Sequence, residues 1–245
     1  MNTLVVRLGR VGMRLPASMW RRVVRAGARR AGKRLESLSS DHRRVRDFTV
    51  TEIIGTGRAV APERIAEGTG IPADRIPGLL EDLERAKVFL FRSDGSSVNW
   101  AYPVTAEETP HRIRLETGER CFASSALDAI ALPLVHAGLT DPDVCVVVGS
   151  ACACCERPIE LILDGELGFR VLTEEADPVI SVPLVDVTRI AQPSIIKEFS
   201  RRSLFFWSTE HVGHHRERIS GLYPGIEQAT AVAEISHSEL FELPR

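Results

Sequence analysis

Three of the five cysteines lie within four positions, at Cys152, Cys154 and Cys155, in a stretch with the composition of a β-strand. Alternate side chains of a strand share a face, so Cys152 and Cys154 could chelate a metal together, and Cys155 would join them only if the chain turned. Thiolates of this kind suit mercury, Cu(I) or zinc. The alternative is core packing, because unpaired cysteine is often buried as a small hydrophobe.

A second group with chemical potential is Ser125 and Asp128, in a Ser-Ala-Leu-Asp sequence before an apolar run with helical spacing. Their spacing places both side chains on one face at the start of a helix. The pattern is close to a capping box, so it predicts an N-cap as readily as a pair of groups lining a site. A weaker candidate for metal ligation is the group His211, His214 and His215, for which a surface cluster is the alternative.

Composition and charge limit the class of protein. The chain has 245 residues and 44% hydrophobic content, enough for one or two globular domains. An odd cysteine count and the lack of an export signal favour the cytoplasm and a reduced state. No apolar run reaches the ~20 residues of a membrane-spanning helix.

The charge is unevenly distributed. Residues 1–46 carry 13 Lys/Arg and 2 Asp/Glu, a net charge of +11, and the remaining residues carry 18 and 31, a net charge of −13. We interpret residues 1–46 as a basic amphipathic arm. It could lie on an anionic membrane surface, contact nucleic acid, dock on the acidic body of the chain, or act as a transit peptide.

Residues 47–104 have the pattern of a winged helix-turn-helix: a short helix from Ala61, a turn at 68–72, a longer helix over 73–87 and a hairpin turning at 93–96. The second helix carries several acidic side chains, which argues against binding to nucleic acid. From residue 105 the chain predicts an α+β body. A helix begins near Ser124 and passes Pro133, and strands follow at 144–148, 159–163, 169–172, 179–182, 204–207 and 229–235.

Residues 48–235 resemble the alkylmercury (organomercurial) lyase family. Three segments carry the resemblance: Arg120-Cys-Phe-Ala-Ser-Ser-Ala-Leu-Asp, Ala151-Cys-Ala-Cys-Cys-Glu-Arg-Pro, and Ser200-Arg-Arg-Ser-Leu-Phe-Phe. The resemblance implies a winged-helix-like N-terminal domain followed by a mixed-sheet catalytic domain over residues 105–245. It also implies protonolysis of a carbon–mercury bond, in which two cysteines capture mercury and an aspartate moves the proton.

The resemblance aligns the aspartate with Asp128 but places serine where the family has its two main cysteines, at Ser125 and at or near Ser200. Hydroxyl oxygen binds mercury weakly, so the ordinary mechanism cannot run unchanged. Cys152 aligns with a cysteine that the family carries outside its main catalytic set. The expectation is therefore a rewired site, with Asp128, Ser125 and Cys152 catalytic and Cys152, Cys154 and Cys155 binding metal.

Three functions remain open. The chain could cleave or capture an organometallic or thiol-complexed small molecule without any required cofactor, with mercury, copper or zinc as substrate, product or ligand. It could instead be a non-catalytic thiolate metal binder: a sensor, chaperone or storage protein. The third possibility is a family member that performs a different lyase reaction through Ser125 and Asp128. The sequence does not fix the oligomeric state.

Overall fold

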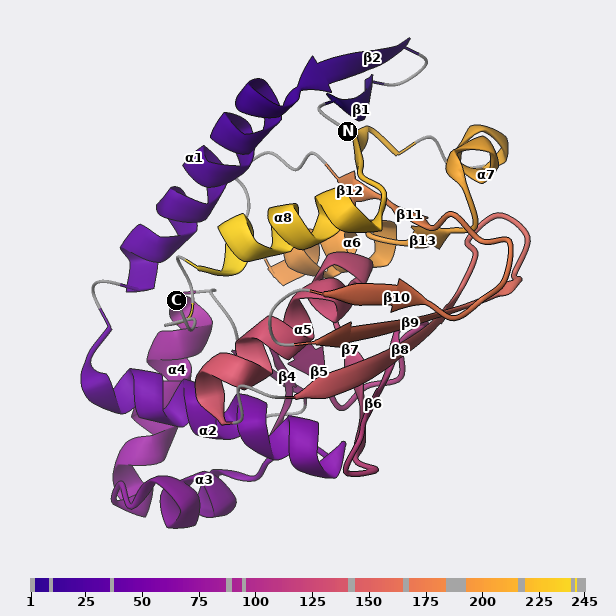
Figure 1. Ribbon diagram of the computed structural model, residues 1–245. Coiled ribbons are helices and arrows are strands. Elements are labelled where there is room, and N and C mark those ends of the chain that lie inside the picture. The colour runs from indigo at the N-terminus through magenta and orange to yellow at the C-terminus, as the bar shows by residue number, and fades with distance from the viewer. Residues whose placement is uncertain are drawn as a thin grey trace.

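A computed structural model gives the structure of residues 3–8, 11–35, 38–86, 90–93, 96–140, 144–164, 168–183, 193–215, 219–238 and 241. The protein is a mixed α and β structure, with helices grouped around one large antiparallel sheet (Figure 1). Of the hairpin turn predicted at 93–96, residues 94–95 lie outside the described residues.

The central element is an eight-stranded sheet with strand order β10-β9-β8-β6-β7-β5-β4-β3, in which each neighbouring pair is antiparallel. Its strands are β3 (Leu90–Ser93), β4 (Ser97–Ala101), β5 (Val104–Thr105), β6 (Arg112–Leu115), β7 (Arg120–Ala123), β8 (Cys145–Ala151), β9 (Pro158–Asp164) and β10 (Phe169–Val171). Along β6 and the first half of β9, exposed and buried residues alternate, as expected of a sheet with one face on the core. The strands predicted at 144–148, 159–163 and 169–172 are confirmed.

Helix α5 (Ala126–Leu139) covers the inner face of the sheet and packs against β7, β8 and β9. It is almost entirely buried because its other side contacts α8 (Ile226–His237), which is itself covered by α1 (Ala17–Leu35) (Figure 1). The helix predicted from Ser124 is confirmed, and it continues through Pro133 to Leu139.

The strand predicted at 229–235 is wrong, because these residues form most of α8. Ile226, Ala229, Ala233 and His237 are buried at spacings of three and four residues, which is a helical stripe. Alanine also favours helix over strand. The consequence is that His237 faces the core beside α5.

The N-terminal segment is part of the folded body. Strands β1 (Thr3–Leu8) and β2 (Val11–Pro16) form a four-stranded sheet with β14 (Gly221–Tyr223) and β12 (Val182–Pro183), in the order β12-β14-β1-β2. Helix α1 then buries Trp20, Val24 and Ala28 at least in part, and leaves Met19 and Val23 exposed. The arm therefore docks on the chain itself. No helix in the described part of the chain is long and apolar enough to span a membrane.

Three helices lie together beside the sheet: α2 (Ser40–Thr56), α3 (Pro62–Thr69) and α4 (Ile76–Arg85), the last preceded by a 3-10 turn η1 (Ala73–Arg75). The helices predicted from Ala61 and over 73–87 are confirmed. Strands β3 and β4 continue the large sheet through β5, so the expected division at residue 104 falls within one sheet. The winged-helix interpretation stays a prediction.

The remaining elements connect these layers: β11 (Val179–Ile180), α6 (Pro193–Arg202), β13 (Phe205–Phe206) and α7 (Thr209–His214). Strand β13 pairs with β11 and lies against β8, so the segment after α6 runs close to both α5 and the end of β8.

The end of α2 fits tightly against strand β7. Gly57 has a left-handed φ of 64°, and a Cβ there would collide with the carbonyl oxygen of Arg120. Gly70 ends α3 with a similar φ of 67°, but no atom lies within 4 Å of the position of its Cβ. We expect Gly57→Ala to lower the free energy of unfolding by roughly 3 kcal/mol and Gly70→Ala by about 1 kcal/mol, as measured by urea denaturation. Equal losses would contradict this packing.

Candidate functional site

The start of α5 is buried, and serine side chains satisfy its backbone. Ser125 is the N-cap, and its Oγ accepts a hydrogen bond from the amide of Asp128 at 3.1 Å. Ser203, which follows α6, accepts from the two preceding amides: its carbonyl from Ala126 at 3.0 Å and its Oγ from Leu127 at 3.2 Å. Ser125 and Ser203 are both 0% exposed, so protein groups take the place of water at this helix end.

The carboxylate of Asp128 projects into the same buried region. Ser125 Oγ donates to Asp128 Oδ2 at 2.8 Å, so this serine both caps the helix and orients the acid. The second oxygen, Oδ1, lies 3.6 Å from Nε2 of His237 and has no hydrogen-bond partner within the described residues. Asp128 is 1% exposed and His237 is 0% exposed. A buried carboxylate oxygen without a partner is rare and needs an explanation.

His237 connects Asp128 to Tyr102, which lies between β4 and β5. The two rings stack with centroids 5.2 Å apart, and the Tyr102 hydroxyl lies 2.7 Å from His237 Nε2. The other ring nitrogen, Nδ1, lies 2.8 Å from the carbonyl oxygen of Ala233. Burial, followed by the charge of Asp128 and a hydrogen bond to it, raises the pKa of Tyr102 well above its usual value. The phenol is therefore a proton donor in this cluster at all ordinary pH values.

A second buried histidine, His111, lies on the sheet side of Ser203. Its Nε2–H donates to the Ser203 carbonyl at 3.2 Å, which leaves Nδ1 to accept from the Ser150 hydroxyl at 3.1 Å. Burial lowers the pKa of His111 to about 4, partly offset by the hydrogen bond to the carbonyl. His111 is therefore neutral at pH 7 and holds the segment that caps α5.

A cavity of about 290 Å³ lies beside this helix start. His111, Ser124, Ser200 and Leu204 are among the residues that line it, and Trp100 Nε1 donates to Ser124 Oγ at its wall. Ser125 and Asp128 do not line the cavity, so the carboxylate does not face it in this structure. Ser200, where the second cysteine of the family was expected, faces this space, and Ser203 contacts α5 instead.

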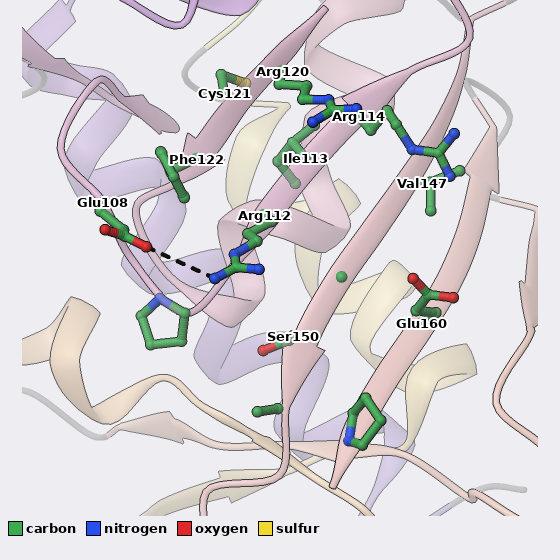
Figure 2. Close-up of a pocket in the computed structure, with 14 residues that line it drawn as sticks. Glu108, Arg112, Ile113, Arg114, Arg120, Cys121, Phe122, Val147, Ser150 and Glu160 are labelled. Atoms are coloured by element: carbon green, nitrogen blue, oxygen red, sulfur yellow. Dashed lines mark ion pairs between the residues drawn. The ribbon is translucent and has the colours of Figure 1, made fainter. Parts of the chain in front are cut away.

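The larger cavity, about 800 Å³, lies along strands β6, β7, β8 and β9 and shares Glu108 and Pro110 with the smaller one (Figure 2). It is lined by side chains of β6 and β7 that include Arg112, Arg114 and Arg120, and Arg112 pairs with Glu108 at 3.8 Å. Neither Ser125 nor Asp128 borders it. Because its charged groups are exposed and hold no acid–base pair of the kind found at α5, we place the candidate site at Asp128.

The clustered cysteines lie at the turn that follows β8. Cys152 is buried and its Sγ accepts from the amide of Trp207 at 3.3 Å; Cys154 is partly buried, and Cys155 is exposed. Burial, and then negative charge on the two neighbouring thiols, raises the pKa of Cys154. Trp207 lies four residues beyond Ser203 in extended chain, a span of roughly 13 Å. The cysteine turn therefore contacts the Trp207 end of residues 203–207, and the start of α5 contacts the Ser203 end.

The described residues contain no group of three or more His, Cys, Asp and Glu side chains arranged to hold a metal ion. His211 lies 3.0 Å from the hydroxyl of Ser208, and His215 packs edge-on against Phe206. The metal-binding roles of Cys152, Cys154 and Cys155 remain predictions.

Sequence reasoning brought Ser125 and Asp128 together, and the structure confirms the cap. It does not identify Tyr102, His111 or His237. No motif marks these residues. Helical spacing of the apolar residues in 226–237 is the one sequence signal that could have predicted that His237 faces α5.

No family model matches this chain, and a search of the curated proteins found no match. Among solved structures, the crystal structure of the mercury-bound form of MerB2 is similar, with a TM-score of 0.65 and 19% sequence identity. The match covers 88% of this chain and 99% of that chain. At this identity the likeness shows the fold alone, and the chain therefore has the fold of the organomercurial lyase MerB2.

The buried His111 makes stability depend on pH. Because its pKa falls from 6.5 to about 4 on folding, the unfolded chain binds a proton that the folded chain does not, and stability decreases as the pH drops from 6.5 toward 4. We expect a loss of roughly 3 kcal/mol over this range, measured by urea denaturation. His111→Gln should flatten this dependence, whereas His214→Gln at an exposed position serves as the control. An unchanged slope in His111→Gln would contradict this account.

Proposed function

We propose that this protein is an organomercurial-lyase-like enzyme in which Asp128 protonates the carbon of a small organometallic molecule that enters as a thiol complex. The MerB2-like fold supports the class of reaction. The observation that carries the proposal is the placement of Asp128: one carboxylate oxygen is fixed by Ser125, and the other has no hydrogen-bond partner in the described structure.

The proposed reaction involves no change of oxidation state. The carbon–mercury bond breaks, its electron pair takes the proton of the Asp128 carboxyl group, and a hydrocarbon leaves. Mercury stays Hg(II) and keeps its first thiolate. A second small thiol then binds the metal as its thiolate and returns a proton to Asp128, which restores the starting state.

The serines at positions 125 and 200 decide where the soft ligands come from. Hydroxyl oxygen is a hard ligand, so Ser125 and Ser200 cannot hold mercury as thiolates would. Small thiols in solution can supply both sulfurs, and Ser125 keeps the acid in place. Since Asp128 is 1% exposed and does not line the 290 Å³ cavity, the structure must open at the start of α5 before the substrate reaches the carboxylate.

Phenylmercury turnover under excess small thiol tests this proposal. We expect benzene release by the wild-type protein and a loss of about 100-fold or more in Asp128→Asn, because the amide cannot donate the transferred proton. Gas chromatography of the headspace measures the product.

Asp74→Asn, on the exposed 3-10 turn, is the matched control and should keep full activity. The proposal is wrong if the wild-type protein releases no benzene, or if Asp128→Asn releases it at the wild-type rate.

A second candidate function is soft-metal capture by Cys152, Cys154 and Cys155 without catalysis. The observation that favours it is the spacing of the three cysteines at the turn after β8, with Cys154 partly exposed and Cys155 exposed. Burial, and then negative charge on Cys152 and Cys155, raises the pKa of Cys154, and a shared cation would offset the part that comes from charge.

Binding of Hg(II) tests this second candidate. We expect one Hg(II) per chain by isothermal titration in the presence of a competing thiol, and at least a tenfold weaker site in the Cys154→Ser, Cys155→Ser double variant. Cys121→Ala is the control, because burial raises the pKa of Cys121 to about 12 and leaves it an inert thiol. Equal affinity in all three proteins would rule out the cluster as the metal site.

A further inference from the structure

The polar groups around Asp128 contain fewer donors than acceptors. Ser125 supplies one hydroxyl proton, which goes to Asp128 Oδ2. Tyr102 supplies another, and it has two neighbouring acceptors, His237 Nε2 at 2.7 Å and the Asp128 carboxylate. Within the described residues, no donor lies at hydrogen-bond geometry to Asp128 Oδ1. With an ionised carboxylate and a neutral imidazole, two protons of described side chains therefore serve three acceptor positions.

The tautomer of His237 is fixed by its surroundings. Nδ1 faces the carbonyl oxygen of Ala233 at 2.8 Å, and a carbonyl can only accept, so Nδ1 carries hydrogen. The Ser236 hydroxyl, 3.2 Å from Nδ1, donates to the Val232 carbonyl at 2.6 Å and is therefore also an acceptor for Nδ1. Nε2 is then an acceptor in the neutral ring and a donor only in the imidazolium. A proton added to this group can therefore sit in two places: on Asp128 Oδ1, or on His237 Nε2, which lies 3.6 Å away.

Burial decides whether that proton is bound. Asp128 is 1% exposed and His237 0% exposed, so an ionised carboxylate beside a neutral ring would leave one negative charge and one unpartnered oxygen away from water. One added proton removes both costs, because either a neutral acid with a neutral ring or an ion pair of zero net charge results.

We propose that the folded protein keeps one additional proton within the group formed by Asp128, His237 and Tyr102, and that His237 and Tyr102 are positioning residues that hold this proton beside Asp128. The inference deepens the proposed function, because this is the proton that the reaction would deliver to carbon. It is tested without turnover, so the two can fail separately.

Two other buried ionisable groups have described partners of their own. Arg46 of α2 stacks on Phe241, one turn beyond His237, and its guanidinium pairs with Asp47 at 2.6 Å. His111 points to Ser150 and Ser203 and is neutral at pH 7. Tyr102 and Asp128 are thus the ionisable groups with described contacts to the His237 ring.

Two spectra of the wild-type protein at about pH 8 test the proposal, a pH at which surface aspartates are ionised and ordinary histidines neutral. Infrared spectroscopy with ¹³C-labelled aspartate detects a protonated carboxyl group, and ¹⁵N NMR of histidine detects an imidazolium. We expect one of these two signals, assigned by its loss in Asp128→Asn or His237→Gln, with His111 as the internal example of a buried neutral ring. The absence of both signals would overturn the proposal.

The pH dependence of unfolding gives an independent measure. An extra proton in the folded state makes the unfolding constant of the wild type rise about tenfold more per pH unit than that of Asp128→Asn between about pH 7.5 and 8.5. The comparison cancels the contribution of the buried Cys121 thiol, which is common to both proteins. Tyr102→Phe removes a hydroxyl but leaves the acid and the ring, and should keep the wild-type slope. Equal slopes in the wild type and Asp128→Asn would refute the proposal.

Discussion

The first turn of α5 must satisfy its backbone amides without water, and this requirement organises the molecule. Ser203 accepts from the first two amides and Ser125 from the third. The segment containing Ser203 is therefore fixed to α5 at one end. At its other end the Phe205 carbonyl accepts from Ala153, and the Trp207 amide donates to Cys152, which fixes the turn that carries the cysteines. Asp128 and the cysteines are therefore positioned by opposite ends of the same segment, residues 203–207.

This arrangement separates hard oxygen and nitrogen groups from soft thiolates. The described hydrogen bonds at the buried end come from oxygen and nitrogen groups, which exchange protons and bind soft metals weakly. The thiols of Cys152, Cys154 and Cys155 lie at the other end, from buried Cys152 to exposed Cys155. In the proposed reaction, Asp128 supplies the proton, and the sulfur ligands come from solution thiols or from the turn after β8.

Much of the fold could be predicted from local pattern, and the site only in part. Ser125 and Asp128 are three residues apart, so helix geometry alone pairs them. His237 and Tyr102 lie more than a hundred residues apart, and their contact depends on how α8 packs against α5, which no local pattern encodes. The strand predicted at 229–235 is wrong for a similar reason, because packing against α5 and α1 selects a helix there. Charge predicts a basic arm over residues 1–46, but the pairing of β1 with β14 places the start of this segment in a sheet.

The pairing of β1 with β14 also sets an order of events during synthesis. Val5 is made more than two hundred residues before its partner Tyr223, so the N-terminal hairpin waits for that length of chain before its sheet can close. Helix α8, which delivers His237, is made after α1 and α5 and is then covered by α1. The acidic centre is consequently completed only after His237 has left the ribosome, so a polypeptide that stops before α8 cannot contain it.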